Sequence, residues 1–198
     1  MRYPRLTVRR RSLRAAGGAA GPDAVSTDAG LLALRVVVGG LVAAHGLQKM
    51  THLLGGVGLT AGAEEFRADG FRGGRLTALA AGSGQTGGGL LLAAGLLTPL
   101  GVAAVASVMT VAATVKFPHG LWVQDDGYEY PLVLILSVAV TGLAGPGAWS
   151  LDRLAGIDWP ASAGIVGCAA GVLGGLATRR VLWRASGPGG MSEVTRSP

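Results

Sequence analysis

The sequence predicts an all-α, polytopic membrane helical bundle with four core transmembrane helices. Charged residues make up 14% of the 198 residues, whereas an ordinary soluble domain has about 25%. The sequence contains long runs without a charged residue. The longest is the 40-residue run over residues 76–115. A helix needs about 20 apolar residues to cross the hydrocarbon core of a bilayer. These runs therefore have the length of membrane crossings, and none has the polar face of a soluble helix.

Five hydrophobic segments follow one another, and each is expected to form one helix. They cover residues 29–50, 76–97, 99–117, 130–146 and 161–179. We divide the longest uncharged run at Thr98-Pro99, because Pro is favoured in the first turn of a helix. The fifth segment is rich in Gly and Ala, and Gly167, Gly171 and Gly175 repeat at the spacing of close helix packing. Whether it crosses the membrane or is re-entrant stays open.

These segments also predict the domain organisation. We expect a basic, disordered cytoplasmic tail over residues 1–28 and a membrane domain over residues 29–153. A fifth membrane helix within residues 154–184 and a disordered tail over residues 185–198 would follow.

The charge pattern predicts a cytoplasmic N-terminus. Six arginines precede the first acidic residue, Asp23, and positive residues beside the first crossing stay on the cytoplasmic side. Four crossings would return Arg179, Arg180 and Arg184 to that side, whereas five would place them outside. The charge rule thus favours four crossings and segment length favours five, so both remain open.

Composition also excludes several kinds of function. Ten of the 17 Lys and Arg residues lie near the two ends of the chain, six before residue 15 and four from residue 179 onward. They suit anionic lipid heads there, and no basic face with stacking residues indicates nucleic-acid binding. Cys168 is the only cysteine, which excludes an internal disulfide and a thiolate metal cage. We predict no metal site, and no cofactor motif is evident.

Polar side chains in or beside the hydrophobic segments are the candidate site residues, because ionisable groups are costly in hydrocarbon. His45, Gln48 and Lys49 share one face of the first helix, with Arg35 at its edge. We expect Glu129 to pair with Lys49 or Lys116 in a shared site near the outer leaflet. The complete candidate set is Arg35, His45, Gln48, Lys49, Gln85, Lys116 and Glu129. No catalytic role is assigned, and helix packing or interface anchoring is the alternative explanation.

Several of these residues lie in motifs that resemble the DoxX family of small bacterial membrane proteins. The resembling motifs are His45-Gly46-Leu47-Gln48-Lys49, Phe66 to Phe71, Ala81 to Thr98, Gly127 to Pro131 and Gly145 to Asp152. Together they cover about residues 30–153. Two positions depart from the family pattern: Gln85 replaces an acid, and Lys116 replaces a residue that is often His.

The resemblance implies a four-helix bundle in the bacterial plasma membrane. Family members are related to thiosulfate:quinone oxidoreductase subunits and are described as oxidoreductases linked to thiols and oxidative stress. We therefore expect an oxidoreductase subunit that links a thiol or sulfur compound to a membrane quinone. The alternatives are a non-catalytic anchor for soluble redox enzymes and a small-molecule transporter. Whether the chain is an enzyme and which oligomer it forms stay open.

Overall fold

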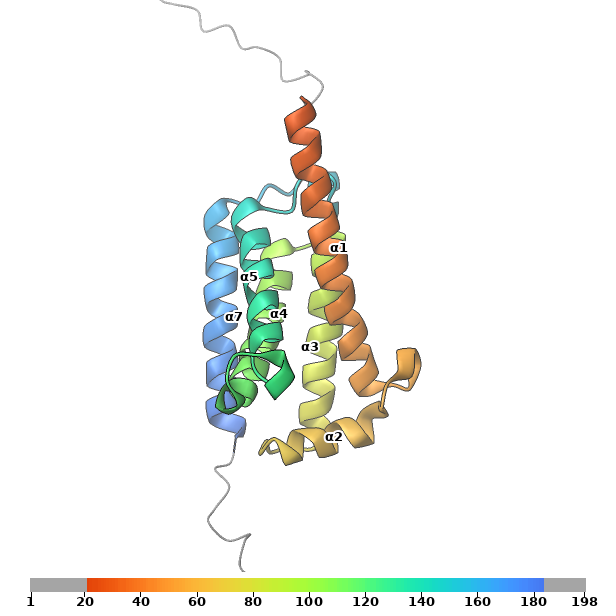
Figure 1. Cartoon of the computed structure of the whole chain (residues 1–198). Helices are drawn as coiled ribbons and strands as arrows, with labels where there is room; N and C mark the ends of the chain where they lie inside the picture. The colour runs from red at the N-terminus through yellow and green to blue at the C-terminus, as the bar shows by residue number, and fades with distance from the viewer. Residues whose placement is uncertain (1–20, 184–198) are drawn as a thin grey trace, which may run out of the picture.

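A computed structural model describes residues 21–183, which form an all-α bundle, as predicted. The α-helices of this part are α1 (Pro22–Met50), α2 (Gly58–Ala68), α3 (Arg75–Ala94), α4 (Thr98–Lys116), α5 (Glu129–Ala144), α6 (Leu151–Leu154) and α7 (Ala161–Leu182). Short 3-10 turns η1 (Leu53–Gly55), η2 (Phe117–His119) and η3 (Val123–Asp125) lie in the connections. The five long helices alternate in direction, so the described chain begins and ends at opposite ends of the bundle (Figure 1).

The five predicted segments coincide with α1, α3, α4, α5 and α7. The largest difference is at the start, where α1 begins at Pro22, so residues 22–28 of the expected disordered tail are helical. Pro22 lies in the first turn and Asp23 lies near the positive end of the helix dipole, and both favour a helix start. Most of the two predicted tails, residues 1–20 and 184–198, lies outside the described residues.

Length and surface both identify a membrane protein. Three segments are long and apolar enough to cross a bilayer: Asp23–Met50, Thr98–His119 and Ala161–Leu182. Val37, Leu136 and Leu173 are among the large apolar side chains exposed on the outside of the bundle. Such side chains belong against lipid when they cover whole helix faces. The fifth helix, α7, is therefore one of the candidate spans and lies beside α4 and α5.

Glycines allow α7 to pack closely against the bundle despite its lack of large side chains. A Cβ at Gly167 or Gly171 would collide with the carbonyl oxygen of Pro99 or Ala103 on α4. Gly164 lies equally close to Gly142 of α5. This close contact is the kind of helix packing that the spacing of Gly167, Gly171 and Gly175 predicted.

One end of the bundle is closed by a network around Asp152, which we call the closed end. Asp152 is fully buried, and its carboxylate accepts hydrogen bonds from Leu97 N (2.7 Å), Thr98 N (2.9 Å) and Thr98 Oγ1 (2.6 Å). The indole Nε1 of Trp159 donates to the same carboxylate at 2.9 Å. Asp152 thereby joins α6 to the turn between α3 and α4 and satisfies N–H groups at the start of α4.

Helices α3 and α4 touch near the closed end and separate toward the other end of the bundle. A Cβ at Gly88 of α3 would lie 2.6 Å from the Cβ of Ala104 on α4, so the helices are in contact there. One turn earlier on α3, a Cβ at Gly84 would meet only Val108, at 3.6 Å. The space between α3 and α4 is therefore a wedge whose apex lies near Gly88.

The wide end of the wedge, which we call the open end, is crossed by the short helix α2 (Figure 1). Gly62 on its buried face lies so close to α1 that a Cβ would be 2.7 Å from the Lys49 carbonyl oxygen. Glu64, Glu65 and Arg67 are exposed. An amphipathic helix of this kind is suited to the plane of a membrane interface.

Candidate functional site

A cavity of about 710 Å³ fills the wedge at the open end of the bundle. Its walls come from the first half of α3, the second half of α4 and the ends of α1, α2 and α7. The α4 wall is mainly apolar and includes Val108, Val111, Ala112 and Val115. The cavity thus combines apolar walls with a few polar groups, which is typical of small-molecule sites.

Four of the seven candidate residues come together in this cavity. His45 and Lys49 of α1, Gln85 of α3 and Lys116 of α4 all contribute to its lining. Gln85 lies farthest toward the apex on the α3 wall and is only 3% exposed, whereas Lys49 and Lys116 lie near the ends of their helices. The structure therefore places these polar residues around one space.

Arg35 lies apart from this group, at the closed end. Its guanidinium donates to the carbonyl oxygens of Ala93 (3.3 Å) and Trp149 (2.7 Å) and is almost fully buried. Arg35 precedes His45 by ten residues, and a helix rises 1.5 Å per residue, so about 15 Å of helix axis separates them. Arg35 therefore lies at the edge of the helix face of His45 and does not share its site.

The expected pairing of Glu129 with a lysine is wrong. One Glu129 carboxylate oxygen accepts a hydrogen bond from Val123 N at 3.0 Å, because the loop before α5 folds back on the helix start. Lys116 instead pairs with Asp126 at 2.6 Å. The nearest acid to Lys49 is Glu65 of α2, at 4.0 Å.

Gln48 also serves the local fold. Its Nε2 donates to the carbonyl oxygen of Leu54 at 2.7 Å and holds the turn that follows α1. Gln48 and Glu129 are both absent from the cavity lining. Gln48 and Glu129 each form a hydrogen bond with the backbone of a nearby turn. The sequence pattern did not predict these bonds.

Three carboxylates at the mouth of the cavity were missed by the sequence analysis: Glu65, Asp69 and Asp126. Burial raises the pKa of Asp69, partly opposed by the positive charge of Lys116. The hydrogen bonds from Lys116 lower the pKa of Asp126. The mouth therefore carries both signs of charge. The amphipathic pattern of residues 58–68 is the signal that could have placed Glu65 on a helix beside α1.

A row of cations and aromatic rings runs along the mouth from α1 to α7. Lys49 Nζ lies 5.0 Å from the centre of the Phe66 ring, and Phe66 meets Phe71 edge to face at 5.8 Å. Arg179 of α7 lies 5.8 Å from the Phe71 ring and 4.1 Å from the Trp183 ring. Such contacts each contribute about 0.5–2 kcal/mol, so this row joins the two sides of the wedge.

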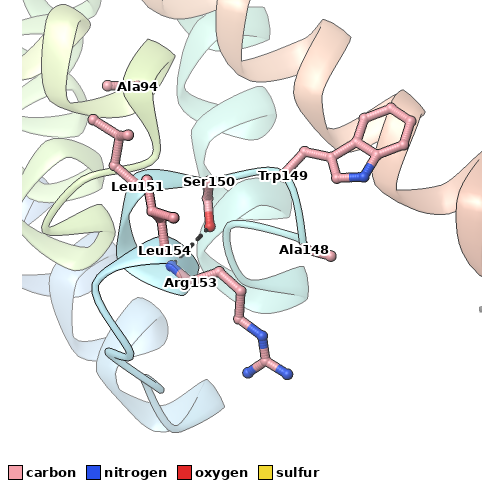
Figure 2. Close-up of a pocket in the computed structure, with 7 residues that line it drawn as sticks. All are labelled: Ala94, Ala148, Trp149, Ser150, Leu151, Arg153 and Leu154. Carbon is pink, nitrogen blue, oxygen red and sulfur yellow. Dashed lines mark hydrogen bonds between the residues drawn. The ribbon is translucent and has the colours of Figure 1, made fainter. Parts of the chain in front are cut away.

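A second cavity, of about 380 Å³, lies at the closed end. Figure 2 shows that the side chains of Trp149 and Arg153 point away from each other. The hydroxyl of Ser150 accepts a hydrogen bond from Arg153 N at 3.2 Å and donates to the Gly147 carbonyl oxygen at 2.8 Å. Arg153 pairs with Asp158. The polar groups of this loop thus serve its own fold.

Comparison with known proteins agrees with the resemblance over the first four helices. The DoxX family model matches residues 30–119, which include α2, α3 and α4 and all but the start of α1. The sequence analysis extended the resemblance to residue 153. The family match ends at residue 119 and confirms the resemblance only up to that residue. No curated protein and no solved structure matches the chain. The chain is therefore similar to the DoxX family over these 90 of its 198 residues, and His45, Lys49, Gln85 and Lys116 all lie within the matched region.

Proposed function

We propose that the protein is the quinone-binding membrane subunit of an oxidoreductase that takes electrons from a thiol or sulfur compound. The observation that supports this proposal is the wedge cavity, which has apolar walls and polar groups at several depths. Its volume of about 710 Å³ lies within the range of about 300–1,000 Å³ that is usual for small-molecule sites. A quinone head group needs apolar surroundings for its ring and hydrogen-bonding groups for its oxygens.

The lining residues divide into two groups with different tasks. Gln85 is buried on the α3 wall and His45 lines the cavity from α1, and these two side chains would bind the head group. Lys49, Glu65, Asp69, Lys116 and Asp126 lie at the mouth, where they would exchange protons with water. Reduction of a quinone to a quinol takes up electrons and protons together, so a continuous polar path from head group to surface suits it.

The electrons must come from outside this chain. Cys168 is its only cysteine, so no internal dithiol can be oxidised to a disulfide. A thiol or sulfur substrate, presented directly or by a soluble redox partner, would supply them. Binding of such a partner is part of the proposal.

The test is quinone binding by the full-length protein in lipid nanodiscs. A soluble short-chain para-benzoquinone is titrated against the wild type, His45→Ala and His52→Ala. His52 is the control because it lies on the same side of the bundle but outside the cavity lining. We expect wild type and His52→Ala to bind alike and His45→Ala to bind about tenfold more weakly, the loss of one good hydrogen bond.

Two results would contradict the proposal. One is absence of quinone binding by the wild type, together with absence of quinone from lipid extracts of the purified protein. The other is equal binding by all three proteins. If soluble redox enzymes co-purify with a protein that binds no quinone, the non-catalytic anchor is the better account.

A further inference from the structure

We infer that Gln85 of α3 and Ser107 of α4 form a two-point clamp for a ring that carries oxygens on opposite sides. The clamp would select para-quinones over rings with a single oxygen. This inference rests on the proposed function and deepens it, since it names the two atoms of the ligand that are recognised and the side chains that recognise them.

The first half of the clamp is the carboxamide of Gln85. This side chain is 3% exposed, lines the cavity, and its Oε1 has no hydrogen-bond partner among residues 21–183. An unpaired amide in apolar surroundings destabilises the folded state. Close packing of α1 holds it in place, because a Cβ at Gly46 would lie 2.6 Å from the Cβ of Gln85. The fold therefore fixes a costly polar group at the narrow part of the wedge.

The second half is the hydroxyl of Ser107 on α4, which lines the cavity on the side toward α7, where a Cβ at Gly174 would lie 3.7 Å from its Oγ. Hydroxyls inside helices normally donate to a carbonyl oxygen of the preceding turn. Thr110 does so to Ala106 (2.7 Å), and Ser137 does so to Val133 (2.8 Å). Ser107 makes no such bond within the described part of the chain, and it lines the cavity. Its hydroxyl is thus available to a ligand.

The space between these groups suits a flat ring. Gln85 and Ser107 lie just below the contact of Gly88 with Ala104, where the wedge is narrow. Small residues line the slot between them, namely Ala81 and Gly84 on α3 and Ala104 on α4. A planar head group inserted edge-first would have one polar group on each side. No lysine or acid lies at this depth of the lining, so neutral hydrogen bonds would decide recognition.

The chemistry of the two groups fits both redox forms of such a ligand. An amide offers a donor and an acceptor, and a hydroxyl does the same. Each can therefore donate to a quinone carbonyl and accept from a quinol hydroxyl after a local rotation. Both forms would be held at the same two points, as repeated turnover requires.

The experiment compares two probes and four variants of the full chain in nanodiscs. The probes are a short-chain para-benzoquinone and a phenol with the same substituents but one ring oxygen. The variants are Gln85→Leu and Ser107→Ala, with Gln48→Leu and Ser137→Ala as controls. The controls make the same changes at side chains that bond to backbone outside the cavity.

We expect Gln85→Leu and Ser107→Ala each to weaken quinone binding about tenfold, which corresponds to about 1.4 kcal/mol. Binding of the phenol should be weakened by only one of the two substitutions. Both control variants should bind each probe as the wild type does. Gln85→Leu should also raise the unfolding temperature, because it removes an unpaired polar group. A purely structural role for Gln85 would lower that temperature instead.

The outcomes separate this inference from the proposal on which it rests. If the wild type binds the quinone but neither substitution weakens binding more than its control does, the clamp is wrong and the quinone site stands. Equal dependence of the phenol on both residues would also overturn the clamp. If the wild type binds no quinone at all, the proposed function fails first.

Discussion

Two buried polar side chains at opposite ends of this bundle, Asp152 and Gln85, differ in how fully their polar atoms are hydrogen-bonded. At the closed end, the Asp152 carboxylate accepts four hydrogen bonds from Leu97, Thr98 and Trp159. At the open end, the deepest polar side chain, Gln85, keeps an unpaired oxygen beside a cavity. A fully satisfied network stabilises a fold, whereas an unsatisfied group costs stability and is kept where function needs it. Arg35 Nε at the closed end also has no partner within the described residues, but Arg35 lines neither cavity. The comparison therefore supports a structural role for Asp152 and, under the proposed function, a binding role for Gln85.

The largest expected effect comes from breaking the closed end. Asp152→Ala would leave the backbone N–H groups of Leu97 and Thr98 and the Trp159 indole without their acceptor. Each loss costs about 1–3 kcal/mol, so we expect the free energy of unfolding to fall by about 3–5 kcal/mol. Chemical denaturation in mild detergent measures this change.

Asp158→Ala is the control for that prediction. Asp158 pairs with Arg153 on the surface, where both side chains are mostly exposed. Exposed ion pairs contribute little, so this variant should unfold as the wild type does. Similar losses in the two variants would contradict the assignment of Asp152 as the main structural acid of this end.

A second pair of variants compares the cost of adding a Cβ at Gly95, directly after α3, with the cost of adding one at Gly84 within α3. Gly95 has a left-handed φ of 62°, and a Cβ there would collide with the guanidinium of Arg35. Gly95→Ala should therefore cost about 2–4 kcal/mol from backbone strain and overpacking. Gly84→Ala should cost less than about 0.5 kcal/mol, because its Cβ would make ordinary contact with Val108. Thermal unfolding of the two variants side by side measures the difference, and equal losses would contradict the wedge geometry.

A smaller effect is expected at the cation–aromatic row of the open end. Arg179→Gln removes the cation that lies over the Trp183 and Phe71 rings. We expect a loss of about 1 kcal/mol, together with faster quinone dissociation, because the row joins α7 to the segment after α2 at the cavity mouth. Stopped-flow release from nanodiscs measures the rate. Arg180→Gln is the control, and an equal rate in both variants would count against the row as a barrier.

The smallest effect is an opposite pH dependence of the contributions of Asp152 and Asp69 to the free energy of unfolding. Burial acts to raise the pKa of Asp152, but the hydrogen bonds from Thr98, Leu97 and Trp159 outweigh it and hold that pKa below its usual value. Its stabilisation is present above the unfolded value of about 3.9 and is lost as the pH falls further. Burial raises the pKa of Asp69. Its contribution therefore favours folding below about pH 3.9 and declines as the pH rises through the raised pKa.

Unfolding midpoints between about pH 2 and about pH 7 test this difference in sign. Asp152→Asn should remove the part of the fall in unfolding midpoint below about pH 4 that Asp152 causes. Asp69→Asn should remove the part of the fall above about pH 4 that Asp69 causes. The two curves should thus deviate from the wild type in opposite directions. Deviation in the same direction would show that one of the two shifts is assigned with the wrong sign.

The helices were predictable because uncharged runs of membrane length leave few alternatives. The polar site was predictable in part. His45, Lys49, Gln85 and Lys116 were identified because polar groups are rare within such runs. Arg35 was grouped with them wrongly, since a helical wheel gives the direction of a side chain and not its depth along the axis.

The remaining differences come from the short connecting segments. Glu129 pairs with the backbone of Val123 and not with a lysine, because the conformation of the loop before α5 decides which donor is near. Glu65 and Asp69 reach the cavity mouth only because α2 turns across the end of the bundle. Such turns depend on contacts between distant parts of the chain, and hydropathy carries little information about them.

The odd number of long helices in the described chain has a consequence for the proposed delivery of electrons to a quinone. The described chain ends at Trp183, whose indole donates to the Asp69 carbonyl oxygen at 3.2 Å beside the cavity mouth. It starts at the opposite end, beyond the Asp152 network (Figure 1). A redox enzyme tethered near residue 183 would have its active site within reach of a bound head group, whereas one tethered near residue 21 would be separated from it by most of the bilayer. The two termini are therefore unequal as attachment points for a donor protein.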